Sequence, residues 1–200
     1  ISDIGFEMYQ KILNEALQEL REEEFKDLYT EDKSVDDMEF VQDCILETDL
    51  ELLIPDTYVN QVAERLMLYQ DLDNTKNQEH LDNYVVGLED RFGPVPEVVN
   101  ELIKSIELRW LAKRIGFEKL VIKSNKMFGY FVAKQTSPFY QSSIFTQVLS
   151  FIQTNPHGVK MNERNDKLRL IFDNVDGISS AIRNLNRIGV SLQSTPSNVK

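Results

Sequence analysis

Residues 119–132 read KLVIKSNKMFGYFV, and this stretch decides the predicted fold. Leu120 and Ile122 alternate with side chains of the other parity, as they do on a strand that buries one face. The residues at 124–126, Ser-Asn-Lys, are typical of a hairpin turn. Large side chains then recur at period two, at Phe128, Tyr130 and Val132. The stretch therefore predicts an antiparallel β-hairpin.

The sequence after this hairpin repeats its pattern. Ser137-Pro138 indicates the start of a helix, and the apolar stripe of that helix comprises Ile144, Val148, Leu149 and Ile152. A second candidate hairpin spans 159–172. A final helix follows it and is closed by Gly189. Residues 118–188 thus read ββα followed by ββα.

Upstream of the first hairpin, the sequence predicts a strand and then a helix. Leu50, Leu52 and Ile54 share one parity and predict a strand that Pro55 ends. The helix predicted at 59–72 follows, because apolar residues recur there at helical spacing. Its stripe comprises Val62, Leu66, Tyr69 and Leu72.

Two more helices precede the hairpin. Thr75 and Gln78 have capping-box spacing, which predicts a helix over 76–91. Gly93-Pro94 is typical of a turn, and a longer helix is predicted between Pro96 and Gly116. Its buried stripe comprises Val99, Leu102, Ile103, Ile106, Trp110 and Ala112. We therefore predict an α+β fold, with an N-terminal helical part followed by a ββα-ββα mixed part with antiparallel hairpins.

The ends of the chain supply two further segments around a main domain predicted at 38–190. Residues 1–37 predict a leading amphipathic helix and an acidic linker, and residues 191–200 a polar tail. The chain begins at Ile1 rather than Met, which indicates processing or excision from a longer chain. A first helix exposed by such a cut would seek an apolar partner, so we expect a dimer through it to be a truncation artefact. Its apolar stripe comprises Phe6, Tyr9, Ile12, Leu13, Ala16, Leu17 and Leu20.

Charge is unevenly distributed along this chain of 200 residues and net charge −11. Residues 1–100 hold 26 acidic and 7 basic side chains, whereas residues 101–200 hold 7 and 15. The acidic half should repel a phosphate backbone and attract a basic protein surface. The basic side chains over 104–134 leave an alternative open, a nucleic-acid-binding accessory module, although duplex-binding proteins concentrate charge more than this.

The sequence offers little to a catalytic role. It lacks the phosphate-binding, zinc and serine-hydrolase signatures, and an enzyme built on buried carboxylates would need a deep pocket with perturbed groups. The single cysteine, Cys44, is flanked by Ile45 and Leu46, so we expect a small buried hydrophobe in a reducing compartment. We therefore predict no catalytic residue, no cofactor and no metal. No apolar run approaches membrane length, which predicts a cytoplasmic protein with no membrane partner.

Three segments carry a recognisable pattern. GFEMY at 5–9 lies in the first predicted helix, LELLIPDTYV at 50–59 is followed by Arg65 and Tyr69, and DRFG lies at 90–93. In this order and spacing they resemble the C-terminal domain of the bacterial transcription-repair coupling factors, the Mfd family. The resemblance extends over most of the chain in layout, and it is strongest in the second and third segments.

The resemblance implies a part in transcription-coupled nucleotide excision repair. The parent protein would be an ATP-dependent DNA translocase, a helicase-like hydrolase that displaces stalled RNA polymerase and recruits UvrA. ATP, Mg and DNA would bind in other modules of the parent, and this chain itself would not be an enzyme. The domain would pack on the UvrB-like N-terminal module of the same protein and mask the UvrA-binding surface, which is autoinhibition.

The same resemblance indicates which residues matter. Glu89, Asp90 and Arg91 are predicted at the protein interface. The motif residues with an expected structural role are Ile54, Pro55, Tyr58, Arg65, Tyr69, Phe92 and Gly93. The chain departs from the family at Gly87 and Gln61, where relatives often carry acidic residues, so the contact is expected to be weaker or shifted.

Overall fold

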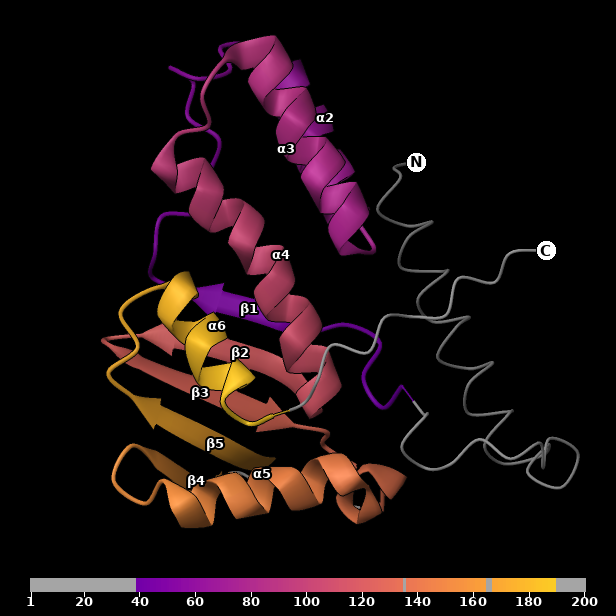
Figure 1. The fold of residues 1–200 in the computed structure, drawn as a ribbon, viewed down its shortest axis with the longest axis vertical. Helices are drawn as coiled ribbons and strands as arrows, with labels where there is room; N and C mark the ends of the chain where they lie inside the picture. The colour runs from indigo at the N-terminus through magenta and orange to yellow at the C-terminus, as the bar shows by residue number, and fades with distance from the viewer. Residues whose placement is uncertain (1–38, 135, 165–166, 190–200) are drawn as a thin grey trace, which may run out of the picture. The chain divides into compact units, whose positions relative to one another are not determined.

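The computed structural model describes residues 39–134, 136–164 and 167–189 (Figure 1). The helix, linker and dimer predicted from residues 1–37 lie outside this part of the chain, as does the polar tail at 191–200. The described residues form a five-stranded sheet and a helical part, which confirms the predicted α+β class. None of the described helices has both the length and the apolar character needed to cross a membrane.

The five strands form one mixed sheet with the order β1-β2-β3-β5-β4. β1 (Ile45–Thr48) runs parallel to β2 (Phe117–Lys123), which pairs antiparallel with β3 (Lys126–Phe131). β4 (Val159–Arg164) and β5 (Lys167–Asp173) form the second hairpin, and β5 also pairs antiparallel with β3. The two ββα units therefore share one continuous sheet.

Three helices cover one face of this sheet. They are α4 (Glu97–Ile115), α5 (Ser143–Thr154), which follows the short helix η2 (Pro138–Gln141), and α6 (Ile178–Asn186). In Figure 1, α4 and α6 lie in front of the sheet. The core beneath them includes Leu108, Ile115, Leu120, Ile122, Met127, Phe131, Val148, Leu170, Phe172, Ile178 and Leu185. The ββα-ββα order predicted for the mixed part is thus confirmed.

The first hairpin forms as predicted, but its second strand buries Met127 and not Phe128 and Tyr130. Both turn residues, at 124–125, have positive φ (54° and 58°), as a two-residue hairpin turn between twisted strands requires. This turn places Met127 opposite Ile122, so Met127 shares the buried face. Phe128 and Tyr130 consequently lie on the other face, which no described helix covers.

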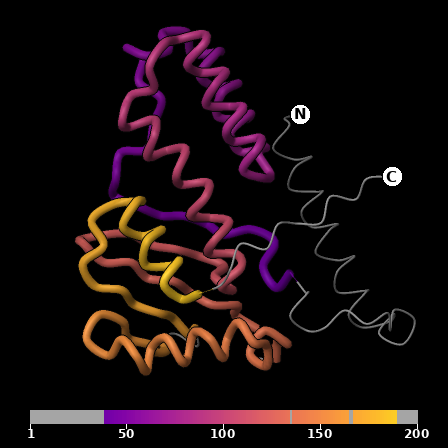
Figure 2. The backbone as a smooth tube through the Cα atoms, in the orientation of Figure 1, coloured from indigo at the N-terminus to yellow at the C-terminus, as the bar shows by residue number. Residues whose placement is uncertain are grey.

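The helical part stands beyond one edge of the sheet. α2 (Val62–Asp73) and α3 (Gln78–Phe92) form a helical hairpin, and the two helices lie side by side in Figure 2. Their core includes Ile54, Val59, Leu68, Leu72, Leu81, Leu88, Val99, Ile103 and Ile106. The last three belong to α4, whose C-terminal half instead packs on the sheet. α4 therefore joins the two cores as one continuous helix.

The strand predicted at 50–54 is wrong. The strand is β1, which ends at Thr48, and the chain then crosses to the helical part without regular structure. Leu50 and Leu52 pack half-buried against the sheet core, whereas Ile54 is buried in the helical core. The alternation arises because this connecting segment contacts both cores, and not because it pairs in a sheet.

The apolar stripe predicted for 59–72 is wrong in part. α2 buries Leu68 and Leu72, which belong to the same core as side chains of α3 and α4. Val62 and Leu66 are 72% and 58% exposed. They lie on the other side of the helix because α3 and α4 both contact α2 on the side of Leu68.

The helix ends match the predictions at some positions and differ at others. The N-cap of α3 is Asn77, whose side chain accepts a hydrogen bond from the His80 amide (2.9 Å). The hydroxyl of Thr75, predicted as the cap, instead donates to a backbone carbonyl of α2 (2.7 Å). Gly116 ends α4 with a φ of 92°, as expected for the residue after a helix.

Candidate protein-docking surface

A tight turn positions the chain where it enters the helical part. The Pro55 carbonyl accepts hydrogen bonds from the amides of Tyr58 (3.1 Å) and Val59 (3.0 Å). Pro55 has a fixed φ and no amide hydrogen, which suits it to this position before a turn. Ile54 and Val59 are buried on either side of the turn. The start of α2 is therefore anchored to the helical core.

Tyr58 connects this turn to the end of α3. Its hydroxyl donates to the Gly93 carbonyl (3.0 Å), and its ring meets the ring of Phe92 edge-on, with centroids 5.8 Å apart. Gly93 has a φ of 80°, a conformation that favours glycine because it has no Cβ. The chain reverses at Gly93 and enters α4, so this contact fixes where α3 ends.

Arg65 and Tyr69 connect α2 to the same segment. The Nη1 atom of Arg65 donates to the carbonyls of Val59 (2.7 Å) and Asn60 (3.2 Å). The hydroxyl of Tyr69 accepts a hydrogen bond from the Ile54 amide (2.7 Å). The seven motif residues thus belong to one set of contacts inside the helical part, and this set holds the exposed end of α3 against α2.

Glu89, Asp90 and Arg91 are all exposed in the last turn of α3. Arg91 pairs with Glu64 on α2, and its guanidinium lies 4.8 Å from the centroid of the Phe92 ring. Within the described residues, neither Glu89 nor Asp90 forms an ion pair. A carboxylate near a helix C-terminus faces the negative end of the helix dipole, so these two charges would be stabilised by an approaching cation.

A stripe of apolar side chains on α2 faces solvent. Val62, Leu66 and Met67, which we call the α2 stripe, are 72%, 58% and 59% exposed, and Val86 on α3 is 55% exposed. Large exposed apolar patches typically mark a protein contact, which makes these side chains candidates for one. Sequence periodicity missed this stripe because a helix with apolar residues on two sides does not reveal which side its neighbours cover.

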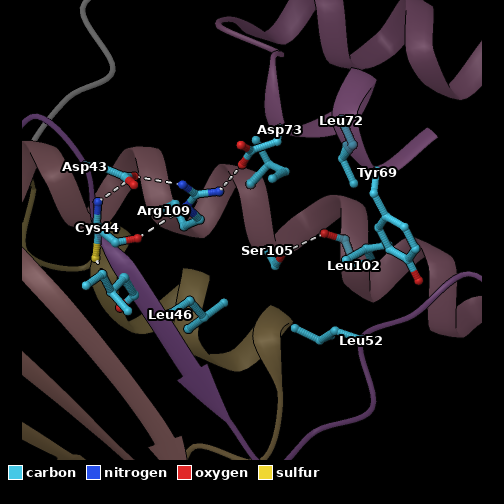
Figure 3. A pocket seen from close by; sticks show the side chains of 12 residues that line it. Asp43, Cys44, Leu46, Leu52, Tyr69, Leu72, Asp73, Leu102, Ser105 and Arg109 are labelled. Atoms are coloured by element: carbon cyan, nitrogen blue, oxygen red, sulfur yellow. Dashed lines mark hydrogen bonds and ion pairs between the residues drawn. The ribbon is translucent and has the colours of Figure 1, made fainter. Parts of the chain in front are cut away.

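A cleft of about 530 Å³ separates the helical part from the sheet (Figure 3). Arg109 of α4 lies at one end, with Nη1 2.8 Å from Asp73, Nη2 2.8 Å from Asp43 and Nε 3.2 Å from the Cys44 carbonyl. Burial lowers the pKa of this guanidinium, but the two carboxylates outweigh it and raise the pKa overall. Because Arg109 bonds to Asp73 on one side of the cleft and to Asp43 and Cys44 on the other, it acts as a joint between the two parts.

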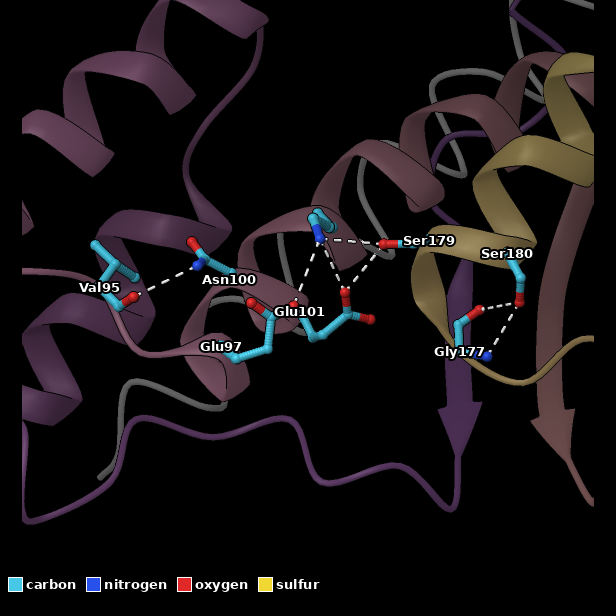
Figure 4. Close-up of polar contacts among 8 residues, drawn as sticks. Val95, Glu97, Asn100, Glu101, Gly177, Ser179 and Ser180 are labelled. Carbon is cyan, nitrogen blue, oxygen red and sulfur yellow. Dashed lines mark hydrogen bonds and ion pairs between the residues drawn. The ribbon is translucent and has the colours of Figure 1, made fainter.

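A second polar joint connects α4 to α6 (Figure 4). The ammonium group of Lys104 lies 3.0 Å from Glu101 and donates to the Ser179 hydroxyl (3.1 Å), which in turn donates to Glu101 (3.0 Å). Burial alone would raise the pKa of Glu101, but the hydrogen bonds from Lys104 and Ser179 hold that pKa below its ordinary value. No sequence pattern indicated either joint, because the partners lie far apart along the chain.

The single cysteine of the chain is not placed to act as a nucleophile. Cys44 is fully buried, as expected, and burial together with the charge of Asp43 raises the pKa of its thiol to about 12. A thiol in this state is a poor nucleophile at neutral pH. Within the described ranges, no group of three His, Cys, Asp or Glu side chains is placed to hold a metal ion.

The basic region at 104–134 does not form a single surface. On α4, Lys104 and Arg109 are paired as described above, and Lys113 pairs with Glu39 (2.7 Å). The lysines of the strands lie on the uncovered face of the sheet: Lys119, Lys123 and Lys126. Because α4 covers the opposite face, the two sets of cations are separated by the sheet.

Comparisons with known proteins address the helical part and the fold as a whole. Residues 48–142 match the family model of the TRCF domain, a range that includes α2, α3, α4 and the first hairpin. A solved structure of the C-terminal domain of transcription-repair coupling factor aligns with a TM-score of 0.58 over 76% of this chain and 96% of that one, at 18% identity. That structural likeness establishes the shared fold.

Three relatives named transcription-repair-coupling factor align over most or much of the chain. The protein of Rickettsia conorii is 26% identical over 166 residues, which cover 82% of this chain and 13% of the relative. Those of Buchnera aphidicola subsp. Baizongia pistaciae and Escherichia coli K12 are each 30% identical, over 65% and 58% of this chain and 17% and 10% of the relatives. The chain thus spans less than a fifth of these relatives.

Proposed function

This chain contains the C-terminal domain of a transcription-repair coupling factor, and we propose that the domain is the autoinhibitory element of that protein. In this proposal the parent is an ATP-dependent DNA translocase of the cytoplasm that displaces stalled RNA polymerase and recruits UvrA to start nucleotide excision repair. The parent's other modules bind ATP, Mg and DNA. The domain itself is a binding element and not an enzyme.

The proposed partner is the UvrB-like N-terminal module of the same protein. The observation that carries the proposal is the exposed surface of the helical hairpin. The α2 stripe lies on α2, and the ion pair between Arg91 and Glu64 connects α2 to the end of α3. This hairpin exposes both apolar and charged side chains, the composition of a protein interface with an apolar centre and a polar rim. We infer that this surface covers the UvrA-binding surface of the module.

The charges suggest how such a contact would be released. Glu89 and Asp90 lie in the last turn of α3 and would be compensated by basic side chains of the partner. Within one chain, a tether raises the effective concentration of the two surfaces, so a weak contact suffices while the protein is compact. Exposed charge pairs contribute little on their own and are screened by salt, so a change in module geometry would open the contact.

The decisive experiment measures UvrA binding by the full-length coupling factor. The double variant Glu89→Lys/Asp90→Lys should bind UvrA more tightly, because the masking contact is weakened. The matched control, Glu79→Lys/Asp82→Lys, makes the same change of charge at the other, also exposed, end of α3. The control should bind UvrA like the unmodified protein.

A direct binding titration provides the second readout. The 200-residue chain should bind the isolated UvrB-like module at low salt and more weakly at high salt. Unchanged UvrA affinity in the Glu89→Lys/Asp90→Lys protein, together with no binding to the module at any ionic strength, would overturn the proposal. Equal gains in both double variants would show that net charge, and not this surface, controls UvrA binding.

A further inference from the structure

The face of the sheet opposite α4, α5 and α6 carries its own pattern of side chains. The strand register places every second residue of each strand on this face, which we call the open face. Its apolar members lie in two neighbouring cross-strand rows. Val121, Phe128 and Ile171 form one, and Ile45 and Tyr130 lie on either side of Lys119 in the other. None of these five side chains belongs to either described core. The centre of the open face is therefore apolar and has no described helix over it.

Two aromatic rings lie next to one another on the central strand of this face. Phe128 and Tyr130 are two residues apart on β3, so their side chains project in the same direction about 7 Å apart. The guanidinium of Arg169 on β5 lies 5.3 Å from the Phe128 ring centroid and 6.0 Å from that of Tyr130. Asn162 holds this guanidinium in place through a 2.7 Å hydrogen bond from Nε. The guanidinium lies over both rings, so the group, which we call the platform, is an ordered cluster of planar side chains.

Cations surround the platform. Two of them are paired with carboxylates of the same face, Lys119 with Glu47 (2.6 Å) and Lys126 with Asp173 (3.1 Å). Four others have no ion pair within the described residues: Lys123, Lys160, Arg164 and Lys167. The same holds for Arg169 in the platform itself. A chain with a net charge of −11 therefore gathers positive charge on one flat face.

We propose that the open face binds single-stranded nucleic acid. Flat aromatic and guanidinium surfaces stack on the faces of unpaired bases, and surrounding lysines and arginines neutralise the phosphates that follow the strand. A flat sheet with its aromatic rings at the centre suits splayed bases better than a duplex, whose bases are stacked and paired. The surface is separate from the helical hairpin proposed to bind the UvrB-like module, so the two proposals stand or fall independently.

An acidic protein segment is the competing occupant, because it would also be attracted by the cations. The rings favour nucleic acid: a carboxylate-rich peptide gains from the lysines but has little to stack on Phe128 and Tyr130. The two occupants therefore differ in their dependence on the aromatic pair. This difference can be measured.

The test is a fluorescence-anisotropy titration of the 200-residue chain into a fluorescein-labelled single-stranded DNA of mixed sequence, about 20 nucleotides long. If about four phosphates are neutralised, binding should weaken about 50-fold between 50 and 200 mM salt. The variant Phe128→Ala/Tyr130→Ala should weaken binding about ten-fold or more, because two stacking surfaces are lost. The duplex of the same sequence and polyglutamate should both bind more weakly than the single strand.

A second variant keeps the test valid if the aromatic variant is poorly folded. Lys160→Glu/Lys167→Glu changes two exposed cations of the open face, and Lys76→Glu/Arg183→Glu makes the same change of charge on exposed residues elsewhere. Only the first should abolish binding. Equal losses in both variants, or tighter binding of the duplex or of polyglutamate, would overturn the proposal.

Discussion

The Nη1 atom of Arg109 lies 2.8 Å from a carboxylate oxygen of Asp73, the last residue of α2. Since Asp43 binds the other end of the guanidinium, one side chain joins α2, α4 and the segment before β1. We expect Arg109→Met to lower the free energy of unfolding by about 1–2 kcal/mol, because charge-assisted hydrogen bonds are lost but both carboxylates are largely exposed. Urea unfolding followed by circular dichroism measures this.

Two further variants define what Arg109 contributes. Arg109→Lys should recover only part of the loss, because an ammonium group cannot bind three separate acceptors in the geometry of a guanidinium. Arg183→Met removes an exposed arginine on α6 and should change stability by less than about 0.5 kcal/mol. A similar loss in Arg109→Met and Arg183→Met would contradict the assigned role of the joint.

The same substitution, glycine to alanine, should change the stability of the domain in opposite directions at Gly87 inside α3 and at Gly93 just after it. Gly87 lies inside the helix with open space where a Cβ would lie, so Gly87→Ala should stabilise the domain by about 0.5–1 kcal/mol. Gly93 has open space too, but its φ of 80° is unfavourable for any residue with a Cβ, so Gly93→Ala should cost about 1–3 kcal/mol. Thermal unfolding of both variants under one buffer condition tests the pair, and a shared sign would refute the interpretation.

The joint between α4 and α6 predicts a specific pH dependence. The pKa of Glu101 is lowered in the folded protein because the hydrogen bonds from Lys104 and Ser179 outweigh the effect of burial. The unfolded chain then binds this proton more readily, so the stabilisation is complete above the ordinary pKa of glutamate and is lost as pH falls through the folded-state pKa. In Glu101→Gln the free energy of unfolding should depend less steeply on pH between about pH 5 and 3, and Ser179→Ala should reduce this dependence in part. Urea midpoints at several pH values measure the slopes.

The thiol of Cys44 should react only when the fold opens. It is fully buried, and its pKa is raised to about 12, so little thiolate is present at about pH 8. We expect iodoacetamide to modify the native chain about 100-fold or more slowly than the urea-unfolded chain. A control cysteine placed by Lys76→Cys in a Cys44→Ala background should react rapidly in the native state. Comparable native rates for the two thiols would contradict the structure.

Local patterns predicted the elements whose signals lie within a few residues. The hairpin turn and the end of α4 at Gly116 depend on backbone conformations that neighbouring residues specify. Gly116 was found where predicted, and the turn occupies 124–125 of the predicted 124–126, with Lys126 already in β3. The false strand at 50–54 arose because alternating burial also occurs in a segment that contacts two cores. Apolar residues at every second position indicate that side chains alternate between buried and exposed, and a strand in a sheet is only one structure that produces this.

Features that depend on long-range contacts could not be predicted. Arg109 meets partners 36 and 66 residues away, and nothing in the spacing of Asp43 and Asp73 indicates that they converge. The open face joins Phe128 and Arg169 across strands 41 positions apart, so its aromatic and basic residues look unrelated in the sequence. Both surfaces of interest are thus created by packing.

The exposed α2 stripe predicts that stability and docking can be separated. Leu66→Gln should leave the free energy of unfolding within about 0.5 kcal/mol, because the side chain is 58% exposed. Leu68→Ala, two residues along the same helix, should cost about 2–4 kcal/mol, because Leu68 is buried in the helical core. If the stripe contacts the UvrB-like module, Leu66→Gln should weaken binding to that module about ten-fold while leaving thermal unfolding unchanged. Isothermal titration calorimetry measures the affinity, and unaltered affinity in a Val62→Gln/Leu66→Gln double variant would remove the stripe from the proposed interface.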